Sequence, residues 1–355
     1  MTLRTRGYAA MEATSTIRPW DFDRREPGPH DVLVDISYCG VCHSDIHQSR
    51  DEWGGAIFPM VPGHEIVGTV SRVGSDVRAW QLGDVVGVGV FVDSCRRCEA
   101  CLAGEEQYCE RGMSTTYNGH EQGGTTPTYG GYSERIVVDQ NYVLRIPSGM
   151  SLPGAAPLLC AGITTYSPIR HFGVRSGDRT AVVGLGGLGH MAVKLLKALG
   201  AETTVLSHSP GKREDALRLG ADDFVDSSAP GAFTQNSRRF DFIIDAVSAA
   251  HNYGSYLDLL RRDGTMVLVG LPDQPSLLDA GKLTDRRRRL AGSVIGGIRE
   301  TQEMLDFCAE HGVTADVEMI PMQDVNDAYG RMLRGDVRFR FVIDIATLAQ
   351  PPRER

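Results

Sequence analysis

The chain has 355 residues, of which 41% are hydrophobic and 23% charged, and its formal net charge is −8. This composition is typical of a globular protein with room for two domains, and it gives the chain no electrostatic reason to bind nucleic acid or an anionic membrane. No apolar run reaches the roughly 20 residues of a membrane span, and residues 1–20 lack the apolar core of a signal peptide, so we expect a cytoplasmic protein.

The first part of the chain predicts a strand-rich unit. Apolar residues alternate with polar ones in several short segments, and glycine and proline separate these segments closely, with no long helical pattern among them. We expect strands at residues 31–38, 68–74, 85–92 and 132–138. Such a run of short strands is typical of an antiparallel barrel or sandwich.

Four cysteines stand within fifteen residues of this unit, and in a cytoplasmic chain such spacing favours a metal site over disulfides. They are Cys95, Cys98, Cys101 and Cys109. Four thiolates at this spacing can close a tetrahedron around Zn²⁺ with no open position, which is the arrangement of a structural site. Arg96 and Arg97 would offset the negative charge. The pattern leaves an iron–sulfur cluster open as the alternative.

A second, sparser set of possible ligands consists of Cys42, His64 and Cys160. Two cysteines and one histidine can form a zinc site whose fourth position is free for water or substrate. Spacing alone does not distinguish these residues from ordinary buried side chains. Proton-handling groups accompany the first two of them, namely Ser44, Asp45, His47 and Glu65.

From about residue 163 strands and helices alternate, which is the pattern of a doubly wound parallel sheet. We expect six strands, at residues 180–183, 203–206, 224–225, 240–247, 265–269 and 293–295. Helices are expected at residues 188–199, 212–219 and 253–260. After residue 297 come two further helices (301–311 and 325–333) and a strand (339–345), and the pattern does not decide which domain they join.

Three glycines follow the first of these strands, and Gly184, Gly186 and Gly189 form the motif Gly-x-Gly-x-x-Gly where the strand turns into a helix. A dinucleotide site needs glycine there for a tight turn, for close approach of the pyrophosphate, and for close packing of helix and strand. The free N–H groups of the helix N-terminus would then face the phosphates. The alternative is a flexible loop.

The turn after the second strand indicates which cofactor is bound. An NAD-dependent fold places Asp or Glu there to bind the ribose 2′-hydroxyl, and this chain has no carboxylate at that point. Instead Ser207, His208 and Ser209 offer small polar groups, and Lys212 and Arg213 offer positive charge. These groups favour the 2′-phosphate of NADP(H), although a plain polar turn has the same composition.

Five motifs together carry a family resemblance: residues 39–47, 63–68, 157–166 and 184–190, and the four-cysteine loop. On these motifs the chain resembles the zinc-dependent medium-chain alcohol dehydrogenases over nearly its whole length. More narrowly it is similar to the cinnamyl alcohol dehydrogenase branch, which includes bacterial NADPH-dependent aldehyde reductases of broad substrate range. The resemblance implies an α/β fold in which a doubly wound parallel Rossmann sheet (residues 162–297) joins a β-rich, barrel-like (GroES-like) catalytic domain (residues 1–161 and 298–355). It also implies a homodimer joined through the cofactor domains, with residues 293–297 near the joint.

The resemblance further implies roles for individual residues. Catalytic zinc would be bound by Cys42, His64 and Cys160, and structural zinc by Cys95, Cys98, Cys101 and Cys109, which makes two zinc ions per chain. Glu65 would replace the zinc-bound water in the resting enzyme, and Asp45 would orient His64. Ser44 would bind the substrate oxygen, and His47 would pass the proton to solvent through the nicotinamide ribose. Cys39 and Cys308 match no ligand position and would be packed thiols.

The cofactor and substrate sites follow from the same resemblance. The cofactor would contact Thr164, Gly184, Gly186, Gly187, Leu188, Gly189, Ser207, His208, Ser209, Lys212, Val269 and Gly270. Trp53 and Phe91 would line the substrate pocket, unless they belong to the core.

The function expected is reversible hydride transfer between NADPH and aromatic or medium aliphatic aldehydes to give primary alcohols. One alternative is a relative that reduces an activated C=C or iminium bond, but the presence of Ser44 and His47 argues against it. Another is a catalytically silent zinc-binding scaffold, and the seven cysteine and histidine ligand positions, all kept, argue against that.

Overall fold

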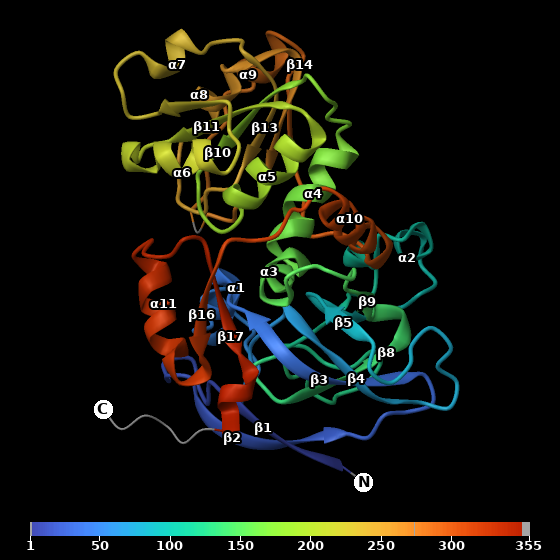
Figure 1. Cartoon of the computed structure of the whole chain (residues 1–355). Helices are drawn as coiled ribbons and strands as arrows, with labels where there is room; N and C mark the ends of the chain where they lie inside the picture. Colours follow the sequence, from blue (N-terminus) through green and yellow to red (C-terminus); the bar gives the residue numbers. More distant parts are fainter. Residues whose placement is uncertain (1, 273, 350–355) are drawn as a thin grey trace. The chain divides into compact units, whose positions relative to one another are not determined.

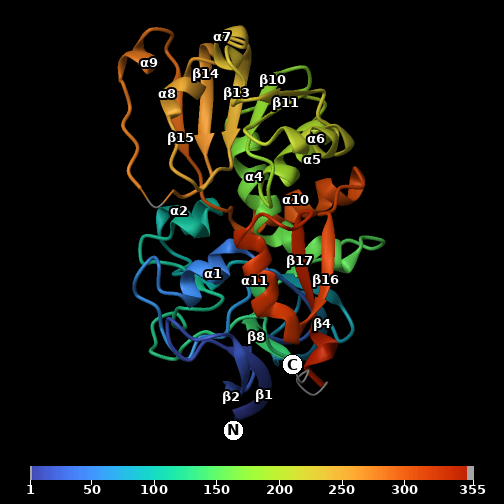
Figure 2. The same cartoon turned by 90° about the vertical axis from the view of Figure 1, so that its left-hand side faces the viewer.

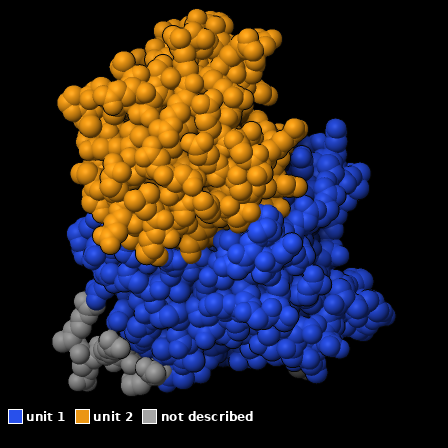
Figure 3. All heavy atoms as spheres, turned by 45° about the horizontal axis from the view of Figure 1, so that its top comes forward, with its two compact units in different colours: residues 1–160, 296–355 blue, residues 161–295 orange. Residues whose placement is uncertain are grey.

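The computed structural model describes residues 2–272 and 274–349 of the chain. The chain forms two compact units, which Figure 3 distinguishes by colour. Unit 1 comprises residues 1–160 and 296–355, and unit 2 comprises residues 161–295. The polypeptide therefore leaves unit 1, builds unit 2, and then returns.

Unit 1 is built on a seven-stranded sheet in the order β16-β17-β3-β4-β5-β9, with β8 paired to β3 (Figure 1). These strands are β3 (Asp31–Gly40), β4 (Ile66–Val73), β5 (Val85–Val88), β8 (Arg135–Asp139), β9 (Leu144–Arg145), β16 (Val317–Pro321) and β17 (Arg340–Asp344). All pairs are antiparallel except β16 with β17. Because β3 pairs with β4, β8 and β17, it is the central strand of the unit and most of its residues are buried.

Shorter elements surround this sheet. Two-stranded sheets are formed by β1 (Thr2–Ala9) with β2 (Arg18–Arg25), and by β6 (Phe91–Asp93) with β7 (Ser114–Thr115). The helices of the unit are α1 (His43–Ser49), α2 (Glu99–Ala103), α3 (Leu152–Ala155), α10 (Ile298–Glu310) and α11 (Val325–Leu333). Residues 298–349 thus contribute two α-helices and two sheet strands to the unit in which the chain begins.

Unit 2 is a six-stranded parallel sheet in the order β12-β11-β10-β13-β14-β15. Its strands are β10 (Arg179–Val183), β11 (Glu202–Ser207), β12 (Asp223–Asp226), β13 (Phe240–Asp245), β14 (Leu260–Leu268) and β15 (Arg289–Gly292). In chain order this is 3-2-1-4-5-6, the doubly wound order, and Figure 2 shows β13, β14 and β15 side by side. The helices are α4 (Ala161–His171), α5 (Gly189–Leu199), α6 (Arg213–Arg218), α7 (Ala232–Gln235), α8 (Tyr253–Leu257) and α9 (Gly281–Thr284).

Side chains on alternate positions of the unit 2 strands face opposite sides of the sheet. Ala181 and Val183 pack in one buried cluster with Tyr253 and Leu257 of α8. The predicted α/β fold with a doubly wound sheet and a second, β-rich unit is confirmed.

The elements differ from the sequence-based prediction at several points. The predicted strand at residues 293–295 is wrong, because β15 lies at 289–292 and is an edge strand that tolerates an exposed arginine at its start. The predicted strand at 85–92 divides into β5 and β6. The prediction missed α1, the β1–β2 pair and α4.

Helix α4 was missed because its sequence contains adjacent β-branched residues and an internal Pro168, which lower intrinsic helix propensity. Its residues from Ala161 to Ile169 are all buried, so tertiary packing outweighs that low propensity. Among the described residues no helix is long and apolar enough to cross a membrane.

Candidate functional site

The first group of candidate ligands is organised around helix α1. Strand β3 ends at Gly40, and Cys42 stands immediately before the helix. The backbone N–H of Cys42 donates to Asp45 Oδ2 at 2.9 Å, so Asp45 stabilises the first turn while lying fully buried beneath it. The short helix thereby presents Ser44, Asp45 and His47 within about one turn.

The structure brings four ligand groups from three segments into one buried place. Cys42 precedes α1, His64 and Glu65 precede β4, and Cys160 is the last residue of the first stretch of unit 1. One donor atom from each of these four residues lies within 4.8 Å of all the others. Residues more than 100 positions apart in the sequence therefore share one potential coordination sphere.

Buried charge dominates the electrostatics of this group. Burial lowers the pKa of His64, but Asp45 and Cys42 outweigh it and raise that pKa well above its ordinary value. The hydrogen bond between the side chains of Cys42 and Cys160 lowers the pKa of Cys42 and raises that of Cys160.

Glu65 is fully buried and pairs through Oε1 with Arg340 of β17, itself 4% exposed. Burial raises the pKa of Glu65 to about 7, although Arg340 acts in the opposite direction. The second oxygen, Oε2, is buried and has no hydrogen-bond partner among the residues that the structure describes.

These observations fit a zinc ion. Two sulfurs, one imidazole and a carboxylate oxygen converge, which is a zinc-type donor set. An unpartnered buried carboxylate oxygen is costly unless a cation or a donor reaches it. His64 Nδ1 lies 3.2 Å from Asp45 Oδ1, so Nε2 is the nitrogen left for a metal.

The remaining candidates of this region are placed as follows. Ser44 Oγ lies 3.7 Å from the Cys42 sulfur. His47 Nδ1 is in contact with Glu52, and its ring stacks on Trp53 at 5.0 Å between centroids. Trp53 is 50% exposed, whereas Phe91 is 3% exposed and packs edge-on against Tyr142.

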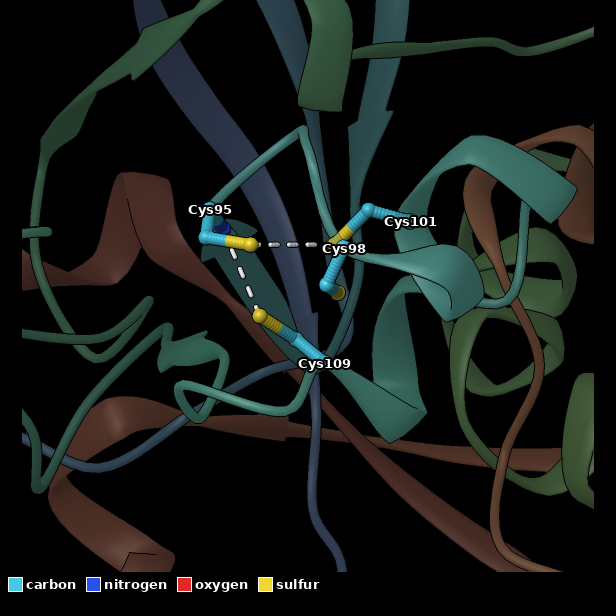
Figure 4. Close-up of side chains that lie close together, drawn as sticks. All are labelled: Cys95, Cys98, Cys101 and Cys109. Carbon is cyan, nitrogen blue, oxygen red and sulfur yellow. Dashed lines mark hydrogen bonds between the residues drawn. The ribbon is translucent and has the colours of Figure 1, made fainter.

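The four-cysteine loop forms a separate lobe of unit 1, between β6 and β7. Figure 4 shows the sulfurs of Cys95, Cys98, Cys101 and Cys109 facing one shared space, and all four lie within 4.8 Å of one another. The backbone N–H of Arg97 bonds the Cys95 sulfur and lowers the pKa of Cys95 to about 6. The backbone N–H of Cys101 likewise lowers the pKa of Cys98. The four sulfurs fit a closed tetrahedral metal site.

The expected counter-charge of this lobe is arranged differently from the prediction. Arg96 does not serve the thiolates, because its guanidinium pairs with Asp93 and Asp139 at 2.8 and 2.9 Å and lies over the Tyr142 ring. Backbone N–H groups favour the charged forms of Cys95 and Cys98 instead, whereas burial raises the pKa of Cys101 to about 12. The two thiols outside both groups, Cys39 and Cys308, are fully buried, as expected of packed thiols.

In unit 2 the glycine motif lies between β10 and α5. Gly184 has φ of +86°, which a residue with a side chain rarely adopts, and a Cβ at Gly189 would lie 2.0 Å from the Gly184 carbonyl oxygen. A Cβ at Gly186 would meet nothing within 4 Å. The turn is thus tight, packed at its helix end, and open at its middle, as a pyrophosphate cradle requires.

The turn after β11 carries the other cofactor candidates. Ser207 is buried and its Oγ accepts from the Ser209 backbone N–H at 3.2 Å, whereas His208 is exposed. Lys212 Nζ donates to the Leu185 carbonyl of the glycine turn at 2.9 Å, which links the two turns. The guanidinium of Arg213 lies over the Phe224 ring and donates to the Phe224 backbone carbonyl. Arg213 therefore packs within unit 2.

Three further candidates also lie in unit 2. Thr164 lies buried in α4, and Val269 and Gly270 follow β14. The backbone N–H groups of the latter two donate to the carbonyl of Asp245 at 2.9 and 3.1 Å. Gly187 and Leu188 complete the glycine turn.

Sequence reasoning missed Arg340 as a member of the first group. The signal was present, because Arg340 is one charged residue among Phe339, Phe341, Val342 and Ile343 in a predicted strand. A charge in an apolar strand is stable only when it is paired, but the sequence does not reveal the partner.

Comparison with known proteins gives matches over most of the chain. The family model "Alcohol dehydrogenase GroES-like domain" matches residues 28–148, and "Zinc-binding dehydrogenase" matches residues 187–310. The chain is 56% identical over 341 residues to NADP-dependent alcohol dehydrogenase C of Mycobacterium tuberculosis, covering 96% of this chain and 98% of that protein. It is 52% identical to aldehyde reductase YahK of Escherichia coli, with 98% and 99% covered.

Two solved structures are similar over almost the whole chain. A cinnamyl alcohol dehydrogenase from Sorghum bicolor superposes with a TM-score of 0.95 at 46% identity, covering 99% of this chain and all of that one. The second, from Helicobacter pylori and complexed with NADP(H), gives 0.92 at 41% identity, covering 98% and 99%.

Proposed function

The chain belongs to the zinc-dependent medium-chain alcohol dehydrogenases, and from that premise we propose how its own residues carry the reaction. It is an oxidoreductase that uses zinc and NADP(H). We propose that it reduces aromatic and medium aliphatic aldehydes to primary alcohols, reversibly. The observation that carries this proposal is the convergence of Cys42, His64, Cys160 and Glu65 in one buried place.

We propose that Cys42, His64 and Cys160 hold the catalytic zinc, which when bound supplies Lewis-acid polarisation of a carbonyl oxygen. Glu65, with Oε2 unpartnered, is the additional carboxylate that can approach the same ion. Asp45 keeps the His64 ring oriented through Nδ1.

Proton transfer falls to Ser44 and His47. Ser44 Oγ lies close enough to the Cys42 sulfur to reach a substrate oxygen bound beside it. His47 is half-buried and contacts the exposed carboxylate of Glu52, and we assign to it the passage of the proton toward solvent. Trp53, stacked on His47, is the better candidate for substrate contact, because Phe91 packs in the core.

In unit 2 the open middle of the glycine turn would receive the pyrophosphate. Ser207, His208, Ser209 and Lys212 would bind the 2′-phosphate. Thr164, Val269 and Gly270 would contact the rest of the cofactor. We assign residues 1–161 and 298–355 to the catalytic domain and 162–297 to the dinucleotide-binding domain.

We assign the four-cysteine lobe to structural zinc, which gives two zinc ions per chain. We further propose a homodimer joined through the dinucleotide domains. In its support, β15 is an edge strand of its sheet, and Val294 beside it is 45% exposed. All eight cysteines are free thiols, which agrees with a cytoplasmic location.

The decisive experiment measures initial rates with cinnamaldehyde, offering NADPH and NADH in parallel. Fast oxidation of NADPH with little oxidation of NADH supports the zinc site, the ribose turn and the substrate class together. Activity with NADH alone would overturn the cofactor assignment, and no activity with either would favour a silent scaffold or a different substrate.

Metal analysis of the Cys160→Ala variant tests the ligand assignment separately. We expect the wild type to hold two zinc ions per chain and the variant one, with turnover abolished and NADPH still bound. Normal rates in Cys160→Ala would refute the zinc assignment.

A further inference from the structure

The carboxylate of Asp45 is saturated with hydrogen bonds. Its Oδ1 accepts from the Gly63 backbone N–H at 3.1 Å and lies 3.2 Å from His64 Nδ1. Its Oδ2 accepts from the Cys42 backbone N–H at 2.9 Å and from the Tyr132 hydroxyl at 3.2 Å. A carboxylate offers about four acceptor positions, so all of them are used.

Among these four donors, Tyr132 differs from the others. The Cys42 and Gly63 donors are backbone groups, and His64 is itself a candidate metal ligand. Tyr132 is therefore a side chain outside the ligand motifs whose hydroxyl donates to the Asp45 carboxylate. It is also fully buried. A second buried tyrosine, Tyr117, stacks on the His64 ring and also interacts with Asp45.

The direction of the Tyr132 hydrogen bond is fixed by its acceptor. Because a carboxylate only accepts, the Tyr132 hydroxyl donates to Asp45, and its oxygen is left to accept from the Tyr329 hydroxyl of α11 at 3.4 Å. The backbone of Tyr132 is held as well, because its N–H donates to the Pro62 carbonyl at 3.0 Å and its carbonyl accepts from Tyr8 at 2.9 Å.

A buried arginine braces the segment before Tyr132. Arg24 of β2 is 8% exposed and donates to the carbonyls of Tyr129 and Gly130 at 2.8 and 2.9 Å. It also donates to Ser133 Oγ at 2.9 Å. Three elements, β2, the segment at 129–133 and α11, thus combine to place one hydroxyl group.

We propose that Tyr132 is a positioning residue of the catalytic metal site, whose hydroxyl fixes Asp45 and through it the His64 imidazole. This inference rests on the proposed binding of zinc by Cys42, His64 and Cys160. Outer partners of a metal-bound histidine govern how firmly the metal is held. Tyr132 therefore controls retention of the catalytic zinc without touching the ion or the substrate.

The other metal group offers a matched comparison. Tyr142 is also almost fully buried, and its hydroxyl lies 2.7 Å from Ser94 Oγ, which lies 3.2 Å from the Cys101 sulfur. In each case one tyrosine hydroxyl reaches a ligand through one intermediate side chain. Tyr132→Phe and Tyr142→Phe thus each remove a hydroxyl that is one side chain away from a proposed metal ligand.

The test compares zinc release from the wild type, Tyr132→Phe and Tyr142→Phe. Zinc-loaded protein is challenged with a chelating dye, and release is followed by absorbance. Cys160→Ala, which retains only the structural zinc, identifies the two phases. We expect Tyr132→Phe to speed release of the catalytic zinc about tenfold and to leave the structural phase unchanged. Tyr142→Phe should do the reverse.

The inference is overturned if Tyr132→Phe releases the catalytic zinc at the wild-type rate. Equal acceleration of both phases also overturns it, because that result would indicate a general loss of rigidity. If Tyr132→Phe does not fold, Tyr329→Phe serves instead, and it should speed the catalytic phase by a smaller factor. If Cys160→Ala loses no zinc, the proposed ligand set itself fails. Loss of one zinc in Cys160→Ala together with unchanged release from Tyr132→Phe refutes only this inference.

Discussion

Replacing Arg340 by methionine should destabilise unit 1 far more than removal of an ordinary surface charge. Arg340 and Glu65 are 4% and 0% exposed and form an ion pair away from solvent. Breaking a buried pair by removing one partner leaves an uncompensated charge and costs about 3–5 kcal/mol. With a urea dependence of about 2 kcal/mol per molar, the unfolding midpoint should fall by roughly 1.5–2.5 M.

The assay can be confined to the correct unit. All three tryptophans, Trp20, Trp53 and Trp80, lie in unit 1, so urea unfolding followed by tryptophan fluorescence reports on that unit. The matched control is Arg72→Met, which removes an exposed pair with Glu26 and should cost about 1 kcal/mol or less.

A second variant separates the lost pairing from lost packing. The double variant Arg340→Met with Glu65→Gln removes both charges, so it should recover much of the stability lost by Arg340→Met alone. The reasoning is refuted if Arg340→Met costs no more than Arg72→Met, or if the double variant is less stable than the single one.

Three other variants test separate parts of the molecule. Ser207→Asp places a carboxylate at the end of β11, where it should repel a 2′-phosphate and accept a hydrogen bond from a ribose hydroxyl. The ratio of kcat/KM with NADPH to kcat/KM with NADH should therefore fall about tenfold or more. An unchanged ratio would contradict the assignment. Cys98→Ser should lower the melting temperature, because it removes a ligand of the structural metal. The kcat of the folded fraction, measured by active-site titration, should change much less. The hydrogen bond to Asp245 raises the pKa of His251 in the folded chain. The pair therefore stabilises the fold at a pH below the pKa that His251 has in the unfolded chain, and this stabilisation is lost as the pH rises through the pKa of the folded chain. His251→Gln should therefore cost more stability at about pH 6 than at about pH 9, and an equal cost would show that the charge plays no part.

Local chemistry made much of the molecule predictable. The alternation of strands and helices gave the doubly wound sheet, and the glycine motif lies at the strand-to-helix turn where its spacing indicates. The four cysteines of the lobe are near neighbours in sequence, so their convergence needs only a short loop. In each case the determining residues lie within one or two elements.

Long-range partners were not predictable in the same way. Nothing in the sequence near Arg340 points to Glu65, and nothing near Tyr132 points to Asp45, because these pairs form only when distant strands and loops pack together. Phe91 illustrates the same limit, since an apolar residue suits a substrate pocket and a core equally well until its neighbours are known.

The position of Arg340 in the chain has a consequence for biosynthesis. All candidate ligands of both metals lie at or before Cys160, whereas Arg340 is in the last sheet strand. At about 5–20 residues per second, Arg340 leaves the ribosome roughly 10–40 s after Cys160. For that interval the nascent chain carries Glu65 and the candidate thiol ligands without Arg340, so the buried ion pair forms only after every candidate metal ligand has been synthesised.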